Sequence, residues 1–106
     1  MKDDIIKADS YDFDRRIENG IKLVFFYEEF NAHCKALEQV LEEVADVYYD
    51  YARVIAIDVE QSSDVADVFA VDTLPSVIIF KDGNIMARIE GVNPPTVYEN
   101  AIEDIM

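Results

Sequence analysis

The chain has 106 residues, of which 51% are hydrophobic, and its 23 acidic and 9 basic residues give a formal net charge of −14 at pH 7. A chain of this length suits one compact domain, residues 1–106, whose core is large enough to fold without disulfides or metal ions. The negative charge has the wrong sign for binding nucleic acid or an anionic membrane, and it favours neutral or basic protein partners.

Two further features bear on location and redox chemistry. The longest uninterrupted apolar run, Leu23 to Tyr27, is far shorter than the roughly 20 residues that span a bilayer, and the N-terminal region has no apolar signal core. We therefore expect a cytoplasmic protein. Cys34 is the only cysteine in the sequence, so no intramolecular disulfide can form.

The first half of the chain alternates between predicted strands and helices. Asp4 to Lys7 can form a short first strand, and residues 10–19 predict a short amphipathic helix behind a Ser or Asp cap, ended by Gly20. Leu23 to Tyr27 is apolar at every position, which is typical of a central strand covered by helices on both faces. From Asn31 onward, apolar residues recur at helical spacing and predict a long helix, at positions 34, 37, 40, 41, 44 and 48.

The second half begins with another apolar strand and a short helix. Arg53 to Val59 predicts the strand, and Ser62 or Ser63 can cap the helix that follows. The expected inner face of this helix consists of Val65, Val68 and Phe69. Together with the preceding elements, these residues make a β-α-β unit.

A hairpin and a last helix complete the predicted order. Val77 to Phe80 and Ile85 to Glu90 are joined through Asp82-Gly83, a pair that supplies the positive φ angles of a tight turn. Asn93 caps the last helix, with Pro tolerated in its first turn and an inner face of Val97, Ala101, Ile102 and Ile105. The order is β-α-β-α-β-α-β-β-α, an α/β fold with a mixed sheet.

This order and three motifs resemble the thioredoxin family. The segment from Leu23 to Lys35 is similar to the family's strand, aromatic residue, Cys-x-x-Cys pair and helix, with its second cysteine at Cys34. Thr73 to Ser76 resembles the family's proline loop, and Gly91 its glycine after the last strand. The resemblance implies a thioredoxin-like three-layer fold, a central mixed sheet flanked by helices, and a cis peptide bond before Pro75.

The differences from the family pattern concern the residues that take part in its redox chemistry. The motif reads Asn31, Ala32, His33, Cys34, so asparagine stands in place of the exposed nucleophilic cysteine and cannot form a mixed disulfide. The resemblance places the family's buried acidic residue at Phe25 and the lysine near it at Ala56. Phe30 replaces the tryptophan before the pair.

Each motif residue also has a structural explanation. Cys34 shares an apolar stripe with Leu37 and Leu41, which suits a small core residue, whereas its first-turn position would favour a reactive thiolate. Asn31 is a good helix cap. His33 and Cys34 are adjacent and point about 100° apart on a helix, so we expect no metal site there. No cofactor is predicted.

Two functions remain open. The first is a redox-inactive binding or structural module that contacts a protein or peptide through a groove beside Pro75, lined by Phe30, Thr73, Leu74, Pro75, Gly91 and Val92. The alternative is a monothiol thiol-disulfide oxidoreductase or redox relay in which Cys34 is the catalytic residue and forms mixed disulfides. The sequence specifies neither the partner's identity nor the oligomeric state.

Overall fold

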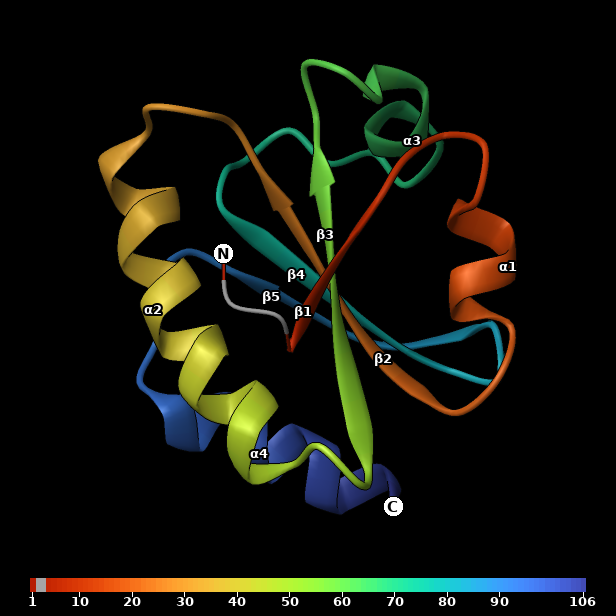
Figure 1. Ribbon diagram of the computed structural model, residues 1–106, viewed down its shortest axis with the longest axis vertical. Helices are drawn as coiled ribbons and strands as arrows, with labels where there is room; N and C mark the ends of the chain where they lie inside the picture. The colour runs from red at the N-terminus through yellow and green to blue at the C-terminus, as the bar shows by residue number, and fades with distance from the viewer. Residues whose placement is uncertain (2–3) are drawn as a thin grey trace.

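The computed structural model describes residues 1 and 4–106, and the elements in that part of the chain follow the predicted order (Figure 1). They are β1 (Ile5–Ala8), α1 (Phe13–Ile17), β2 (Ile21–Tyr27), α2 (Ala32–Val47), β3 (Ala52–Asp58), α3 (Ser63–Val68), β4 (Ser76–Lys81), β5 (Asn84–Glu90) and α4 (Pro95–Ile105).

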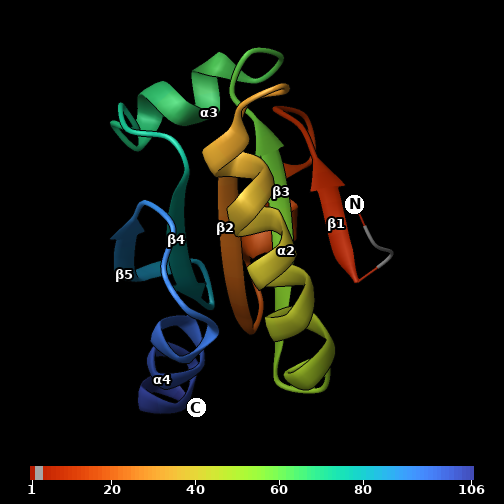
Figure 2. The ribbon, with the colours of Figure 1, turned by 90° about the vertical axis from the view of Figure 1, so that its left-hand side faces the viewer.

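The strands form one five-stranded mixed sheet in the order β1-β3-β2-β4-β5. β1 and β2 both run parallel to β3, while β4 is antiparallel to β2 and β5 to β4. Helices α2 and α4 cover one face of the sheet and α1 and α3 the other (Figures 1 and 2). The predicted α/β class, with a sheet between two helical layers, is confirmed.

Strand β2 is the central strand of the sheet, and every side chain from Leu23 to Tyr27 is buried. Phe25 and Tyr27 face the α2 side and stack with ring centroids 5.3 Å apart, while Phe26 faces α1 and α3. Burying each large apolar side chain contributes roughly 1.5–3 kcal/mol. The apolar run predicted as a doubly covered strand therefore holds both layers together.

Helix α2 starts where the sequence predicts. The Asn31 side chain caps it by accepting a hydrogen bond from the backbone N–H of Cys34 at 3.0 Å. Its buried residues follow the predicted stripe and include Cys34, Leu37, Leu41 and Val44. Even α2 has only 16 residues, and no helix in the described part of the chain is long and apolar enough to cross a membrane.

The predicted hairpin between β4 and β5 is also present. Asp82 and Gly83 have φ angles of 51° and 83°, as a turn with two left-handed central residues requires. The Asp82 carboxylate accepts a hydrogen bond from the Gly20 N–H at 2.7 Å, and the Asp82 N–H donates to the Gly20 carbonyl at 3.0 Å. The hairpin is thereby tied to the loop that leads into β2.

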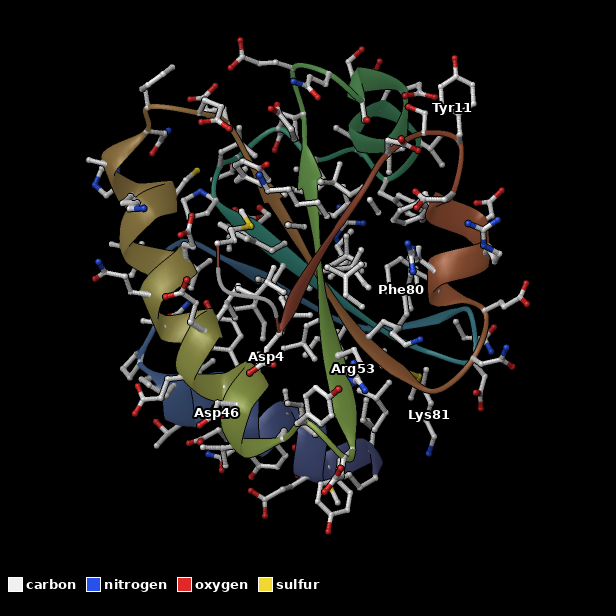
Figure 3. All side chains as sticks on the ribbon, in the orientation of Figure 1. Asp4, Tyr11, Asp46, Arg53, Phe80 and Lys81 are labelled. Carbon is white, nitrogen blue, oxygen red and sulfur yellow. The ribbon has the colours of Figure 1, made fainter. Side chains whose placement is uncertain are left out.

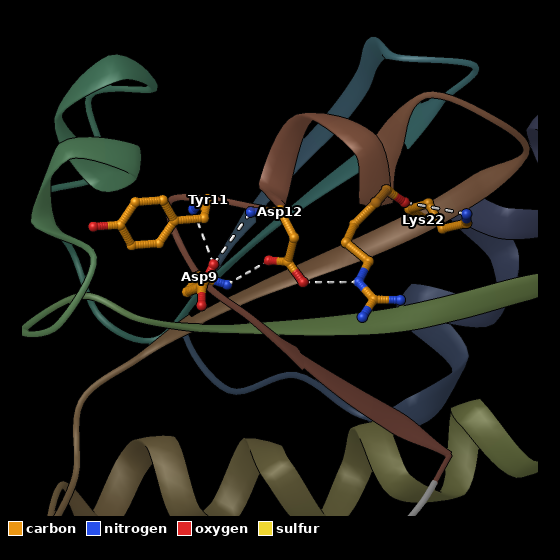
Figure 4. Close-up of polar contacts among 5 residues, drawn as sticks. Asp9, Tyr11, Asp12 and Lys22 are labelled. Carbon is orange, nitrogen blue, oxygen red and sulfur yellow. Dashed lines mark hydrogen bonds and ion pairs between the residues drawn. The ribbon is translucent and has the colours of Figure 1, made fainter.

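The start of the first helix was predicted wrongly. The Asp9 carboxylate accepts hydrogen bonds from the N–H groups of Tyr11 and Asp12, at 2.9 and 3.2 Å (Figure 4). The Asp12 carboxylate accepts one from the Asp9 N–H at 2.8 Å. These reciprocal bonds hold residues 9–12 in a turn, a local alternative to helix that Asp side chains favour, so α1 begins only at Phe13.

Two predicted inner faces are partly wrong as well. Val68 is 76% exposed, and Ala66 is buried beside Val65 in its place. In α4, Val97 is 37% exposed, whereas Tyr98, absent from the predicted face, is completely buried one turn before Ile102. The other predicted inner residues, Val65, Phe69, Ala101, Ile102 and Ile105, do pack against the core.

The cap of the last helix was also misplaced. The residue before the first turn of α4 is Pro94, not Asn93. The Asn93 amide instead donates to the Glu90 carbonyl at 3.1 Å and to the Tyr98 hydroxyl at 3.3 Å. Asn93 thus fastens α4 to the end of β5 and gives the buried Tyr98 hydroxyl a partner, as buried polar groups require.

Candidate functional site

The motif lies in the turn between β2 and α2, at the end of the sheet where the parallel strands terminate (Figure 1). Phe30 precedes it with a left-handed φ of 61° and a fully exposed side chain. Ala32 and His33 are exposed in the first turn of α2, whereas Cys34 is only 3% exposed. The motif therefore presents its first residues to solvent and its single thiol to the core.

Both ends of the Asn31 amide are occupied. Its oxygen accepts the hydrogen bond from the Cys34 N–H, and its nitrogen donates to the Glu28 carboxylate at 2.8 Å. A helix cap of this kind contributes about 1 kcal/mol relative to alanine. Asn31 thus fixes the turn at the position where the resemblance places a nucleophile.

Burial raises the pKa of the Cys34 thiol, the Glu28 carboxylate raises it further, and a hydrogen bond from the Glu28 backbone opposes both. Lys35, the adjacent cation, is directed to Glu38, with its ammonium 3.4 Å from that carboxylate. Because a thiolate is the reactive form of cysteine, this environment favours an inert, protonated thiol near neutral pH.

The positions corresponding to the family's buried acid and lysine are both apolar. Phe25 in β2 is the direct partner of Ala56 in β3, and both are completely or almost completely buried. Ala56 in turn is the partner of Lys7 in β1. Across the described sheet this row continues through Val77 and Ile89, so Lys7 on the edge strand is its only charged residue, and sequence reasoning missed it.

The structure brings the predicted proline loop and the glycine after β5 together. The Leu74–Pro75 peptide bond is cis, and the Pro75 carbonyl accepts a hydrogen bond from the Gly91 N–H at 2.9 Å. Thr73 and Val92 are exposed, Leu74 is half-buried and Pro75 is buried. Within residues 1 and 4–106, the backbone N–H and carbonyl of Leu74 have no hydrogen-bond partner.

A pocket of about 480 Å³ opens on the other side of the motif, between β1 and the start of α2. Its walls include Lys7, Tyr27, Phe30 and Cys34, and none of the proline-loop residues. Sequence reasoning missed this pocket, because the pocket depends on β1 lying at the sheet edge with Lys7 on the α2 face. Phe30 thus borders the pocket as well as belonging to the predicted groove.

Nowhere in residues 1 and 4–106 do three or more His, Cys, Asp or Glu side chains lie where they could hold one ion. His33 is exposed while Cys34 points into the core, in keeping with their adjacent positions on a helix.

The sheet order, the helix-capped motif, the cis proline and the glycine that follows β5 define a protein of the thioredoxin fold class. The family model "Thioredoxin" matches residues 4–104. Among individual proteins, the chain is 37% identical to a thioredoxin of Staphylococcus epidermidis over 90 residues, covering 85% of this chain and 86% of the relative. It is 34% identical to a thioredoxin of Staphylococcus aureus over the same shares.

A solved structure is similar over almost the whole fold. It is described as the structural basis of the thiol resolving mechanism in yeast mitochondrial 1-Cys peroxiredoxin via glutathione/thioredoxin systems. It has a TM-score of 0.85 and 29% sequence identity, and covers 95% of each chain. On the family match and these relatives, the chain belongs to the thioredoxin family.

Proposed function

We propose that this thioredoxin-fold protein is a redox-inactive binding module. The observation that carries the proposal is the state of Asn31, which stands at the nucleophile position with both ends of its amide engaged in the turn. An amide cannot form a thiolate, and the single thiol of the chain, Cys34, is buried.

The chemistry of disulfide reduction explains why this loss is decisive. A dithiol enzyme attacks a substrate disulfide with one thiolate and is released from the mixed disulfide by a second thiol. This chain has one cysteine, so the release step has no internal thiol. Phe25 and Ala56 also supply no acid or amine to move the proton of Cys34.

We further propose that a protein or peptide is held at the motif end of the sheet. The surface predicted for this contact supports the proposal because Phe30 and Val92 are exposed and the backbone N–H and carbonyl of Leu74 have no hydrogen-bond partner among the described residues. An extended peptide can pair with such groups as an added strand.

The test is a protein-disulfide reduction assay with a small dithiol as reductant. We expect the wild-type protein and Cys34→Ala to give the same rate, equal to that of buffer, because neither contains a resolving thiol. Turnover above buffer that disappears in Cys34→Ala would overturn the proposal.

A second function, monothiol redox chemistry, has one observation in its favour: Cys34 lines the 480 Å³ pocket as well as the core. In that chemistry, the Cys34 thiolate attacks glutathione disulfide, forms a mixed disulfide with one glutathione, and releases the other as a thiolate that takes up a proton. Intact mass after incubation with glutathione disulfide tests it. Rapid, stoichiometric glutathionylation of the native protein would favour the monothiol function, and labelling only in denaturant would exclude it.

A further inference from the structure

Charge is unevenly distributed between the two ends of the sheet. The motif end is built from residues 9–12, 28–31, 58–75 and 90–94, which connect the strands or terminate them. These segments contain 10 of the 23 acidic residues and none of the 9 lysines and arginines. Arg53 and Lys81 lie toward the opposite end of the sheet (Figure 3).

Few cations from neighbouring elements compensate this charge. Arg16 forms an ion pair with Asp12 at 3.1 Å, Lys35 is paired with Glu38, and Arg88 donates to the Phe69 carbonyl. Lys7 lines the pocket from the edge strand. The exposed carboxylates of Glu29, Glu60 and Asp67 have no ion pair within residues 1 and 4–106.

Large apolar side chains stand exposed among these carboxylates. Tyr11 and Phe30 are almost completely or completely exposed, and Val68 is three-quarters exposed. Tyr11 projects outward from the turn held by Asp9 (Figures 3 and 4), and Phe30 is followed directly by the helix cap. Exposed aromatic residues on fixed backbone are typical anchors of protein interfaces, and aromatic rings also attract cations to their faces.

We infer that the motif end docks a basic, partly apolar segment of a partner protein. This inference rests on the proposed binding function and specifies its partner. Phe30 is the anchor: an arginine of the partner lies over its ring and against Glu28 and Glu29, while apolar residues cover Val92.

The same charges disfavour other occupants of this surface. A dimer would bring together two chains that each carry a net charge of −14, and like charges facing each other oppose association. Nucleic acid would bring phosphates to a surface without a lysine or arginine in its connecting segments. A cationic peptide is the ligand whose charge complements the surface.

The experiment is fluorescence anisotropy with a labelled peptide of alternating Arg and Leu, compared with the same peptide in which Gln replaces every Arg. Low-salt and high-salt buffers are both used, because attraction between exposed charges is screened by salt. We expect the Arg peptide to bind saturably at low salt, to weaken as salt is added, and to bind at least about tenfold more tightly than the Gln peptide.

Two matched variants locate the binding surface. The triple variant Glu29→Gln, Glu60→Gln, Asp67→Asn removes three carboxylates from the motif end. The control Glu43→Gln, Asp46→Asn, Asp104→Asn removes three exposed carboxylates from α2 and α4, away from that end. Both change the net charge equally, so we expect the first to weaken binding about tenfold and the control to change it less than about twofold.

Phe30→Ala tests the anchor, and we expect it to weaken binding about tenfold without changing the fold, because the ring is fully exposed. Equal losses in the two triple variants, an unchanged affinity in Phe30→Ala, or equal binding of the Gln peptide would overturn the inference. So would failure of the Arg peptide to bind at low salt. These results leave the proposed redox inactivity untouched, since that is decided by the disulfide reduction assay.

Discussion

Asn31 shows how one residue can replace a reactive group with a structural one. Its amide caps α2 and donates a hydrogen bond to the Glu28 carboxylate. The position at which the resemblance places a nucleophile therefore holds a side chain that stabilises the turn. The cap was predictable from sequence because asparagine before an apolar helical stripe is a local signal. The bond to Glu28 was not, since it depends on how the chain leaves β2.

Asn31→Cys tests whether the absence of a cysteine at position 31 alone accounts for the proposed redox inactivity. We expect it to allow an internal disulfide with Cys34 yet to give only weak disulfide reduction, because Phe25 and Ala56 provide no proton transfer to the second thiol. The unfolding free energy of the reduced variant should fall by about 1 kcal/mol through loss of the cap. A reduction assay and urea titrations under reducing conditions measure the two effects.

Asn31→Ser is the matched control for this substitution. Serine retains a capping oxygen and offers no thiol, so it should keep the stability within about 0.5 kcal/mol of wild type and give no turnover. Full thioredoxin-like turnover in Asn31→Cys alone would show that the apolar pair Phe25 and Ala56 matters little for the chemistry.

Among the elements, α4 shows that the periodicity of apolar residues predicts only part of a helix's buried face, and that packing determines the rest. Ile102 and Ala101 were placed correctly near the core, but Val97 was predicted to face inward and Tyr98 was not. In the structure Tyr98 is completely buried and its hydroxyl bonds to Asn93. A tyrosine inside a helix faces the core only if a partner for its hydroxyl is in place, and that partner comes from the preceding loop.

Truncating these two neighbours in α4 should have very different effects. Tyr98→Ala removes a fully buried ring and should lower the unfolding free energy by about 3–5 kcal/mol, while Val97→Ala should cost less than about 1 kcal/mol. Tyr98→Phe isolates the hydroxyl and should cost about 1 kcal/mol. Urea unfolding of the three variants measures these differences, and similar losses for Val97→Ala and Tyr98→Ala would contradict the observed packing of α4.

In other elements too, features set by residues nearby in the sequence were predictable, and features set by competing or distant contacts were not. The Leu23 to Tyr27 strand and the Asp82-Gly83 turn were predictable because their signals lie within a few residues. The start of α1 was missed because the Asp9 side chain competes for the N–H groups of the next residues. Val68 was misplaced because α3 is too short for its period to fix which face is buried.

For the whole molecule, the pocket between β1 and the start of α2 was the feature that could not be predicted from the sequence. It requires the register that sets Lys7 beside Ala56, and Ala56 beside Phe25, across three strands far apart in the chain. Periodicity indicates which residues share a face of one strand but not which strands are neighbours. The groove around Pro75, by contrast, was predicted from the family resemblance and stays a prediction.

Stability should decline on the alkaline side of neutral pH. Burial raises the pKa of Cys34, Tyr27 and Tyr98 above their ordinary values of 9.0, 10.0 and 10.0. The unfolded chain therefore loses these protons first, and their contribution to stability is complete below the unfolded pKa and is lost as pH rises through the folded pKa. Urea unfolding over an alkaline pH series measures the decline.

Cys34→Ala isolates the thiol's share of that pH dependence. We expect the variant to be less stable by up to about 2 kcal/mol near neutral pH, through the small cavity it leaves. Its stability should then fall less steeply than that of wild type as the pH passes 9.0. Parallel pH profiles for the two proteins would show that the thiol does not have a raised pKa in the folded state.

The reactivity of Cys34 in the native protein decides between the proposed redox inactivity and monothiol chemistry. The measurement is a pH series of iodoacetamide labelling, followed by intact mass, with the same protein in denaturant as the unhindered reference. A buried, protonated thiol should label far more slowly than the reference near neutral pH and ionise above 9.0. Rapid labelling of the native protein, with an apparent pKa below about 7, would contradict the claim and favour monothiol redox chemistry.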